Sequence, residues 1–283
     1  MKILIIGNGY LGNRAKEMWG DEAVLVTTMI NTVDDVRTLI TEHLPDAIFN
    51  AAGITGKPNV DWCETHQLET VLGNTVLPIL IAQAAQEAGI YLLHLATGCI
   101  FYGRSTHEDG VWDESDYGNP IAVYSKSKYA ADLALSTLPN VGIARLRMPI
   151  DDHPCPPNLI DKITTYPKVI DVENSVTVVP DLLQTCYQLM QKKGEGIFHC
   201  TNPGSIRHRE IIALYEQLVD PTHKNEWITE EDLVKQGLAK KKRSNNFMSS
   251  IRLAELGIEM RDIKVALRDV MEKYAKAKKE ERV

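Results

Sequence analysis

Short apolar runs alternate with amphipathic stretches through the first half of the chain. The runs are Ile3–Ile6, Ala23–Val26, Ala47–Asn50, Tyr91–Thr97 and Gly142–Leu146, and stretches with helical spacing cover 34–43, 66–88 and 124–138. Apolar runs separated by helices are typical of buried parallel strands joined by right-handed crossovers. The pattern therefore predicts an α/β fold with a doubly wound parallel sheet.

The second half of the chain departs from this alternation and then rejoins it. Proline-rich 149–157 begins an excursion, after which 181–192 is predicted as a helix and 196–200 as a strand of the same sheet. Further helices are predicted over 209–219, 230–237 and 263–279. We predict a core over 1–148, completed by 176–200, and a smaller substrate-binding lobe over 149–175 and 201–283, at the carboxyl edge of the sheet, where ligands bind in such folds.

The composition is that of an ordinary globular protein and limits the partners. Hydrophobic residues make up 44% and charged residues 24% of the chain, and the net charge of -7 gives no general attraction for nucleic acid or an anionic membrane. The five cysteines are far apart, the histidines show no metal-ligand spacing, and no stretch looks long enough to span a bilayer. We expect a cytoplasmic protein without a catalytic metal.

Gly7, Gly9 and Gly12 follow the first apolar run and precede a predicted helix over 13–19. A strand, a glycine turn and a helix N-terminus together bind the pyrophosphate of a dinucleotide, because glycines let the backbone approach the phosphates and the helix start offers free N–H groups. The turn therefore predicts a Rossmann-like core, with a purely structural glycine turn as the alternative. The expected cofactor contacts here are Gly7, Gly9, Tyr10, Leu11, Gly12, Asn50, Ala51 and Ala52.

The end of the second apolar run bears on the choice of cofactor. An acid about 20 residues after the glycines would bind the 2′-hydroxyl of NAD, but this chain has Thr27, Thr28 and Met29 there. Without an acid to repel a 2′-phosphate, and with Arg14 close to the turn, NADPH is favoured and NADH is the alternative. Arg14 could instead be an ordinary solvated helix residue.

Tyr124 and Lys128 lie four residues apart on a predicted helix, so their side chains share one face. A neighbouring ammonium favours the phenolate and lowers the pKa of a tyrosine, which makes the phenol a usable general acid. Thr97 ends a strand at the sheet edge, where its hydroxyl could bond a substrate oxygen. The spacing alone is weak, because Tyr274 and Lys278 repeat it on a helix predicted to be solvated.

The combination of the glycine turn with Thr97, Tyr124 and Lys128 resembles the motifs of the extended short-chain dehydrogenase/reductase family. Segments 50–64, 96–101, 147–149, 174–175, 201–204 and 243–246 follow the order of motifs in dTDP-4-dehydrorhamnose reductases and, more closely, in the C-terminal module of plant rhamnose synthases. The resemblance implies that Thr97 positions the carbonyl, Tyr124 transfers the proton and Lys128 holds the nicotinamide ribose. One departure is the glycine spacing, one residue shorter than the family's G-x-x-G-x-x-G.

The module that this chain resembles epimerises C3 and C5 of a nucleoside-diphosphate (NDP) 4-keto-6-deoxy-glucose and reduces C4 with NADPH, making UDP- or dTDP-rhamnose. The resemblance assigns the epimerisation to Cys99, which shares a face with Thr97 if the strand continues, and to Lys162. The alternative is a buried, inert Cys99 and a surface Lys162. The resemblance and local context place these residues on the substrate: Thr55, Asn74, Arg147, Asn174, Asn202 and Arg243.

Two other functions stay open. A reductase without epimerase activity would not need Cys99, and a non-catalytic relative, such as the regulatory subunit of methionine adenosyltransferase, would not need Thr97, Tyr124 and Lys128 together. The sequence does not choose between UDP and dTDP. By family analogy we expect a homodimer and a separate 4,6-dehydratase acting upstream, because the chain is too short to contain that enzyme as a second domain.

Overall fold

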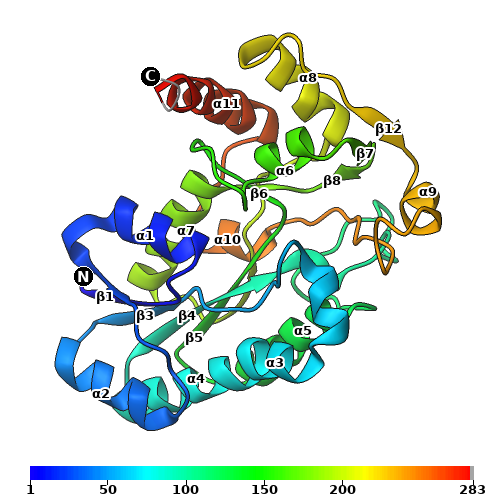
Figure 1. The fold of residues 1–283 in the computed structure, drawn as a ribbon. Helices are drawn as coiled ribbons and strands as arrows, with labels where there is room; N and C mark the ends of the chain where they lie inside the picture. Colours follow the sequence, from blue (N-terminus) through cyan, green and yellow to red (C-terminus); the bar gives the residue numbers. More distant parts are fainter. Residues whose placement is uncertain (281–283) are drawn as a thin grey trace.

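A parallel sheet forms the centre of the computed structural model, which describes residues 1–280 (Figure 1). The strand order is β10-β5-β4-β3-β1-β2, and every neighbouring pair is parallel. The strands are β1 (Ile3–Ile6), β2 (Ala23–Val26), β3 (Ala47–Asn50), β4 (Tyr91–Thr97), β5 (Val141–Leu146) and β10 (Gly196–His199). The predicted fold class is confirmed, and β10 is the strand by which the chain returns to the sheet.

Helices cover both faces of the sheet because its strands are apolar on both sides. Along β1, Ile3 and Ile5 enter one buried cluster. Leu4 and Ile6 enter another, as alternation along a strand requires. The first cluster is closed by α1 (Tyr10–Trp19), α7 (Val179–Lys192) and α10 (Ile251–Glu255), and the second by α2 (Val33–His43), α4 (Leu77–Ala88) and α5 (Val123–Leu135).

The remaining segments form a smaller lobe with its own apolar cluster, seen at the top and right of Figure 1. Its helices are α6 (Leu159–Thr165), α8 (His208–Leu218), α9 (Glu230–Lys235) and α11 (Ile263–Glu280). Short strands pair as β6 (Pro149–Ile150) with β9 (Thr177–Val178), β7 (Lys168–Ile170) with β12 (Glu226–Ile228), and β8 (Glu173–Asn174) with β11 (Ile206–Arg207). Leu253 and Ile258, expected in the lobe, pack against the sheet instead. The domain boundaries themselves stay a prediction.

One helical run matches the helix predicted over 66–88 and is largely apolar. It comprises α3 (Gln67–Val71), a π-helical turn (Leu72–Val76) and α4, and by length and composition it could cross a membrane. The expectation that no stretch is long enough is therefore wrong on those terms. Ile81, Ala82 and Ala85 of α4 pack in the core beneath the sheet, which is the position of a core helix.

Candidate functional site

The glycine turn between β1 and α1 allows the backbone to pack against itself on one side and leaves it open on the other. A Cβ on Gly7, whose φ is +117°, would lie 2.4 Å from the amide nitrogen of Ala52, and one on Gly12 would lie 1.9 Å from the carbonyl oxygen of Gly7. A Cβ on Gly9 would meet nothing within 4 Å. Two glycines are therefore required by the protein's own packing, whereas the space beside Gly9, at the start of α1, is free for a ligand.

The other residues expected at the cofactor lie around this turn. Ala51 donates its amide to the carbonyl of Ile6 at 2.8 Å, which places the end of β3 beside the end of β1. Asn50 accepts a bond from the amide of Ala52 at 3.0 Å. Thr27 is exposed just beyond β2, and Leu11 is partly buried on α1. These positions agree with a nucleotide lying across the ends of the first three strands.

Arg14 is not available in the way the sequence suggested. Its guanidinium bonds Asp151 at 2.8 Å and Asp152 at 2.8 Å, and it also pairs with Glu17. Tyr10 donates its hydroxyl to the same Asp151 at 3.0 Å. Because three carboxylates already neutralise Arg14, the geometry favours its holding the glycine turn to the loop after β6 over binding a 2′-phosphate.

Thr97, Tyr124 and Lys128 converge at the carboxyl end of β4. The Tyr124 phenol interacts with the Thr97 side chain, and the Thr97 hydroxyl accepts the amide of Cys99 at 3.1 Å. Lys128 donates its ammonium to the carbonyl of Leu95 at 2.9 Å. The expected phenol, hydroxyl and ammonium therefore meet at one sheet edge.

The electrostatics of these groups differ from the expectation. Burial raises the pKa of Tyr124, the nearby Cys99 raises it further, and the bond with Thr97 acts to lower it. Burial lowers the pKa of Lys128 to about 8, against the opposing effect of Asp132. The expected lowering of the phenol's pKa by Lys128 is therefore not seen in the protein alone, where the ammonium is held against the sheet.

Cys99 reaches the site by a turn rather than along the strand. β4 ends at Thr97 as predicted, and Gly98–Ile100 form a single turn of 3₁₀ helix, so the strand does not continue to Cys99. The thiol nevertheless interacts electrostatically with Tyr124 and with Lys162 of α6. Burial lowers the pKa of Lys162, while Cys155 and, more weakly, Cys99 act to raise it. The two residues expected to act in epimerisation are therefore within electrostatic range of each other.

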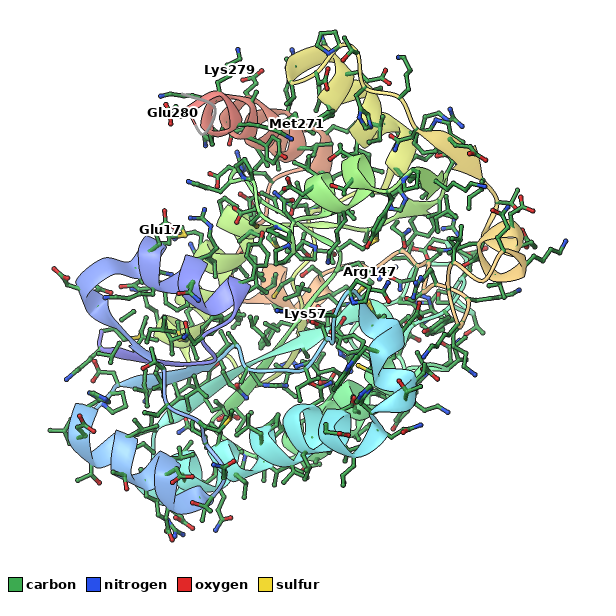
Figure 2. All side chains as sticks on the ribbon, viewed as in Figure 1. Glu17, Lys57, Arg147, Met271, Lys279 and Glu280 are labelled. Carbon is green, nitrogen blue, oxygen red and sulfur yellow. The ribbon has the colours of Figure 1, made fainter. Side chains whose placement is uncertain are left out.

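Arg147 lies beside this thiol, between the sheet and the lobe (Figure 2). Its side chain is 3% exposed, and one terminal nitrogen donates to the Cys99 sulfur at 2.9 Å. The other terminal nitrogen donates to Asn174 Oδ1 at 2.8 Å and to the carbonyl of Ser244. Arg147 therefore faces the turn that carries Cys99 rather than open space.

The remaining substrate candidates divide into loop and framework residues. Asn74 is buried and bonds both the amide and the carbonyl of Ile54, at 2.7 and 2.9 Å, so it fixes the loop that carries exposed Thr55. Asn174 and Asn202 are 0% exposed, and the polar atoms of both amides bond to protein groups. Their geometry favours a framework role over direct contact with a substrate.

Arg243 is also engaged by the protein. Its guanidinium makes two bonds to the carboxylate of Asp61, at 3.0 and 2.9 Å, and the pair is partly exposed. This ion pair joins the segment after α9 to the loop after β3. A diphosphate at Arg243 would have to share it with, or take it from, Asp61.

This geometry agrees with a known family. The family model described as the RmlD substrate binding domain matches residues 1–276. The chain belongs to this family. It is 34% identical over 273 residues to a bifunctional dTDP-4-dehydrorhamnose 3,5-epimerase/dTDP-4-dehydrorhamnose reductase of Arabidopsis thaliana, covering 93% of this chain and 90% of the relative.

Two further family relatives are informative. A trifunctional UDP-glucose 4,6-dehydratase/UDP-4-keto-6-deoxy-D-glucose 3,5-epimerase/UDP-4-keto-L-rhamnose-reductase of Arabidopsis thaliana is 35% identical over 94% of this chain, which spans only 41% of that relative's length. Among solved structures, the L780 UDP-rhamnose synthase from Acanthamoeba polyphaga mimivirus superposes with a TM-score of 0.88 at 29% identity, covering 96% of this chain and 99% of the other.

Some contacts of the site could not be predicted from the sequence. Asp151, in a loop without periodicity, was missed. Ser244 and Asn246 belong to the motif identified at 243–246, but their contacts with Arg147 and Asn174 were not predicted. Asp132 could have been found, because it follows Lys128 by one helical turn. Two groups of side chains bring possible metal-ligand atoms within 4.8 Å of one another: His107 with Asp113 and Asp116, and Asp151 with Asp152 and His153. Both groups already form ion pairs within the protein.

Proposed function

We propose that this protein binds an NDP-4-keto-6-deoxy-glucose and NADPH, inverts C3 and C5 of the sugar, and then reduces its C4 ketone, producing UDP- or dTDP-rhamnose. The single observation that carries the proposal is the position of Cys99, in contact with Arg147 and within electrostatic range of Lys162 and Tyr124. A reductase needs a proton donor at the ketone, but a thiol and an amine in the same pocket suit an additional proton transfer at carbon. The names of the two plant relatives support the same pair of reactions.

The residues near the glycine turn fit a dinucleotide. The space beside Gly9 and the start of α1 suit a pyrophosphate, and exposed Thr27 places no negative charge where a 2′-phosphate would lie. When bound, NADPH would supply the hydride for reduction of C4. Tyr124, close to Thr97, would give a proton to the C4 oxygen, and Lys128 would hold the ribose beside it.

Epimerisation uses the same ketone. A C–H bond next to a carbonyl is acidic, because the electron pair left behind delocalises onto the oxygen as an enolate. One group takes the proton on one face of the sugar, and a second group returns a proton to the same carbon on the other face. Cys99 and Lys162 would be these two groups, with Thr97 and Tyr124 bonded to the enolate oxygen. No electrons are gained or lost in this step.

The test uses the purified full chain with NADPH and either UDP- or dTDP-4-keto-6-deoxy-glucose in D₂O. The proposal expects oxidation of NADPH, a rhamnose product identified by NMR, and deuterium at both C3 and C5. The Cys99→Ala variant is expected to lose deuterium uptake at C3 and C5. It is expected largely to keep hydride transfer when the ketone supplied is already epimerised. Reduction by the wild type without deuterium uptake would favour the reductase that lacks epimerase activity.

The non-catalytic alternative predicts a different outcome. A regulatory protein would bind the dinucleotide but would not oxidise it, and Tyr124→Phe would then behave like the wild type with the keto-sugar. If the variant loses turnover but retains NADPH binding, this alternative is rejected. A 4,6-dehydratase activity must supply the keto-sugar, and the chain spans only 41% of the length of the trifunctional relative.

A further inference from the structure

We propose that Arg147 is a positioning residue that keeps the Cys99 sulfur anionic, so that Cys99 starts the epimerisation as the base and Lys162 as the acid. The inference rests on the proposed epimerase activity. It differs from the sequence-based expectation, in which Arg147 contacts the substrate. The sequence assigned no order to the two proton transfers.

The position of the guanidinium supports this role. One terminal nitrogen lies 2.9 Å from the sulfur, and the backbone amide of Arg147 donates to Thr177 Oγ1 at 2.9 Å. The other terminal nitrogen is held by Asn174 and by the carbonyl of Ser244. Because the head group is anchored on the side away from Cys99, its remaining N–H and its charge point at the sulfur. Charge-assisted hydrogen bonds of this kind favour the anionic acceptor.

The surroundings keep Arg147 away from a substrate phosphate. Its side chain is 3% exposed, and its Nε has no hydrogen-bond partner among residues 1–280. Asn246 donates to the carbonyl of Gly98 at 3.0 Å and so holds the turn that carries Cys99. Together, Asn174, Ser244 and Asn246 form a shell of residues around Arg147 and this turn. A buried cation needs an anion nearby, and the Cys99 thiolate is placed to be that anion.

Arg147 contacts the Cys99 sulfur, and three further titratable groups, Lys162, Tyr102 and Tyr124, interact with it electrostatically. Arg147 and Lys162 are cationic and favour the thiolate, whereas Tyr102 and Tyr124 are phenols that are neutral near pH 7. In the proposed starting arrangement, a thiolate in contact with the guanidinium of Arg147 lies near a protonated Lys162. The thiolate then removes the proton at carbon, the S–H bond forms as the C–H bond breaks, and the ammonium of Lys162 supplies the new C–H proton.

The test measures the alkylation rate of each cysteine against pH in the free protein, by iodoacetamide labelling and peptide mass spectrometry. Only a thiolate reacts. In Arg147→Gln the midpoint of the Cys99 profile is expected to move up by about one to three pH units, as for loss of an adjacent opposite charge. Arg147→Lys keeps the charge and is expected to stay near the wild-type midpoint. Partly exposed Cys155 is the internal control.

The three buried cysteines report on folding in the same samples: Cys63, Cys186 and Cys200. An unchanged Cys99 profile in Arg147→Gln, with these three still protected, overturns the proposal. If they become reactive, Arg147→Lys decides, because an upward shift despite the retained charge also overturns it. The deuterium exchange at C3 and C5 is expected to follow the Cys99 midpoint. A wild type that reduces the ketone without exchange refutes the epimerase, while the alkylation profiles still test the contact between Arg147 and Cys99.

Discussion

Replacing Lys128 by methionine is expected to stabilise the fold at neutral pH while destroying the proposed activity. Lys128 is buried, and its ammonium bonds the carbonyl of Leu95 at 2.9 Å. Burial of the charge lowers its pKa from 10.5 to about 8. The protein thus keeps a charged group where an apolar side chain of similar length would be more stable, as enzymes do where function requires it.

The size of the effect follows from the pKa. Each factor of ten in an acid constant is worth about 1.4 kcal/mol, so the lowering from 10.5 to about 8 corresponds to about 3 kcal/mol of instability at neutral pH. Methionine also loses the bond to Leu95, worth about 1 kcal/mol. The expected net gain for Lys128→Met is therefore about 2 kcal/mol in the free energy of unfolding near pH 7.

The sign of the pH dependence makes the test specific. Between the folded and unfolded pKa values the native lysine is neutral while the unfolded one is still protonated, so the unfolded state binds more protons and the wild type gains stability as pH rises. Urea titrations at about pH 7 and about pH 10 are expected to show the variant's advantage shrinking to nothing. Exposed Lys126, on the same helix, gives the control Lys126→Met. A Lys128→Met variant that is less stable than the wild type at about pH 7 refutes the reasoning.

Two other predictions concern the glycine turn and a buried ion pair. Gly12→Ala is expected to lower the melting temperature sharply, because the new methyl would lie 1.9 Å from the carbonyl oxygen of Gly7. At Gly9 a methyl would meet nothing within 4 Å, so Gly9→Ala is expected to melt at the wild-type temperature. It is expected to bind NADPH more weakly, as measured by nucleotide fluorescence. Unweakened binding by the Gly9 variant contradicts the phosphate position. Arg145→Met leaves Asp132 buried without its 2.9 Å ion pair and is expected to lower the free energy of unfolding by about 3–5 kcal/mol in urea titrations. A loss below about 1 kcal/mol argues against a buried pair of this kind.

The strands of the sheet could be predicted closely from the sequence. The bounds predicted for β1 to β4 coincide with those in the structure, because a strand buried on both faces is a continuous apolar run that ends where polar or glycine residues begin. The two- and three-residue strands of the lobe could not be found this way. Their pairing is set by the packing of the lobe rather than by a repeating pattern.

The identities of the site residues were easier to predict than their partners. Thr97, Tyr124 and Lys128 converge as expected because each is tied to the end of a strand or the start of a helix. Arg14 and Arg243 were expected to be free for phosphates, but each is bound by a carboxylate far away in the chain, Asp151 at 137 residues and Asp61 at 182 residues. The direction of Cys99 also depended on local geometry, because the turn at Gly98 ends the alternation of the strand.

The shell around Cys99 has a consequence for protein engineering. Asn174, Ser244 and Asn246 come from separate stretches of the chain, yet all three hold either Arg147 or the cysteine loop. Grafting the cysteine alone onto a ketoreductase that lacks epimerase activity would transfer the base without the arginine that supports it. A successful transfer would require three parts of this protein to be moved together: β8 with Asn174, the segment after α9 with Ser244 and Asn246, and the turn that carries Cys99.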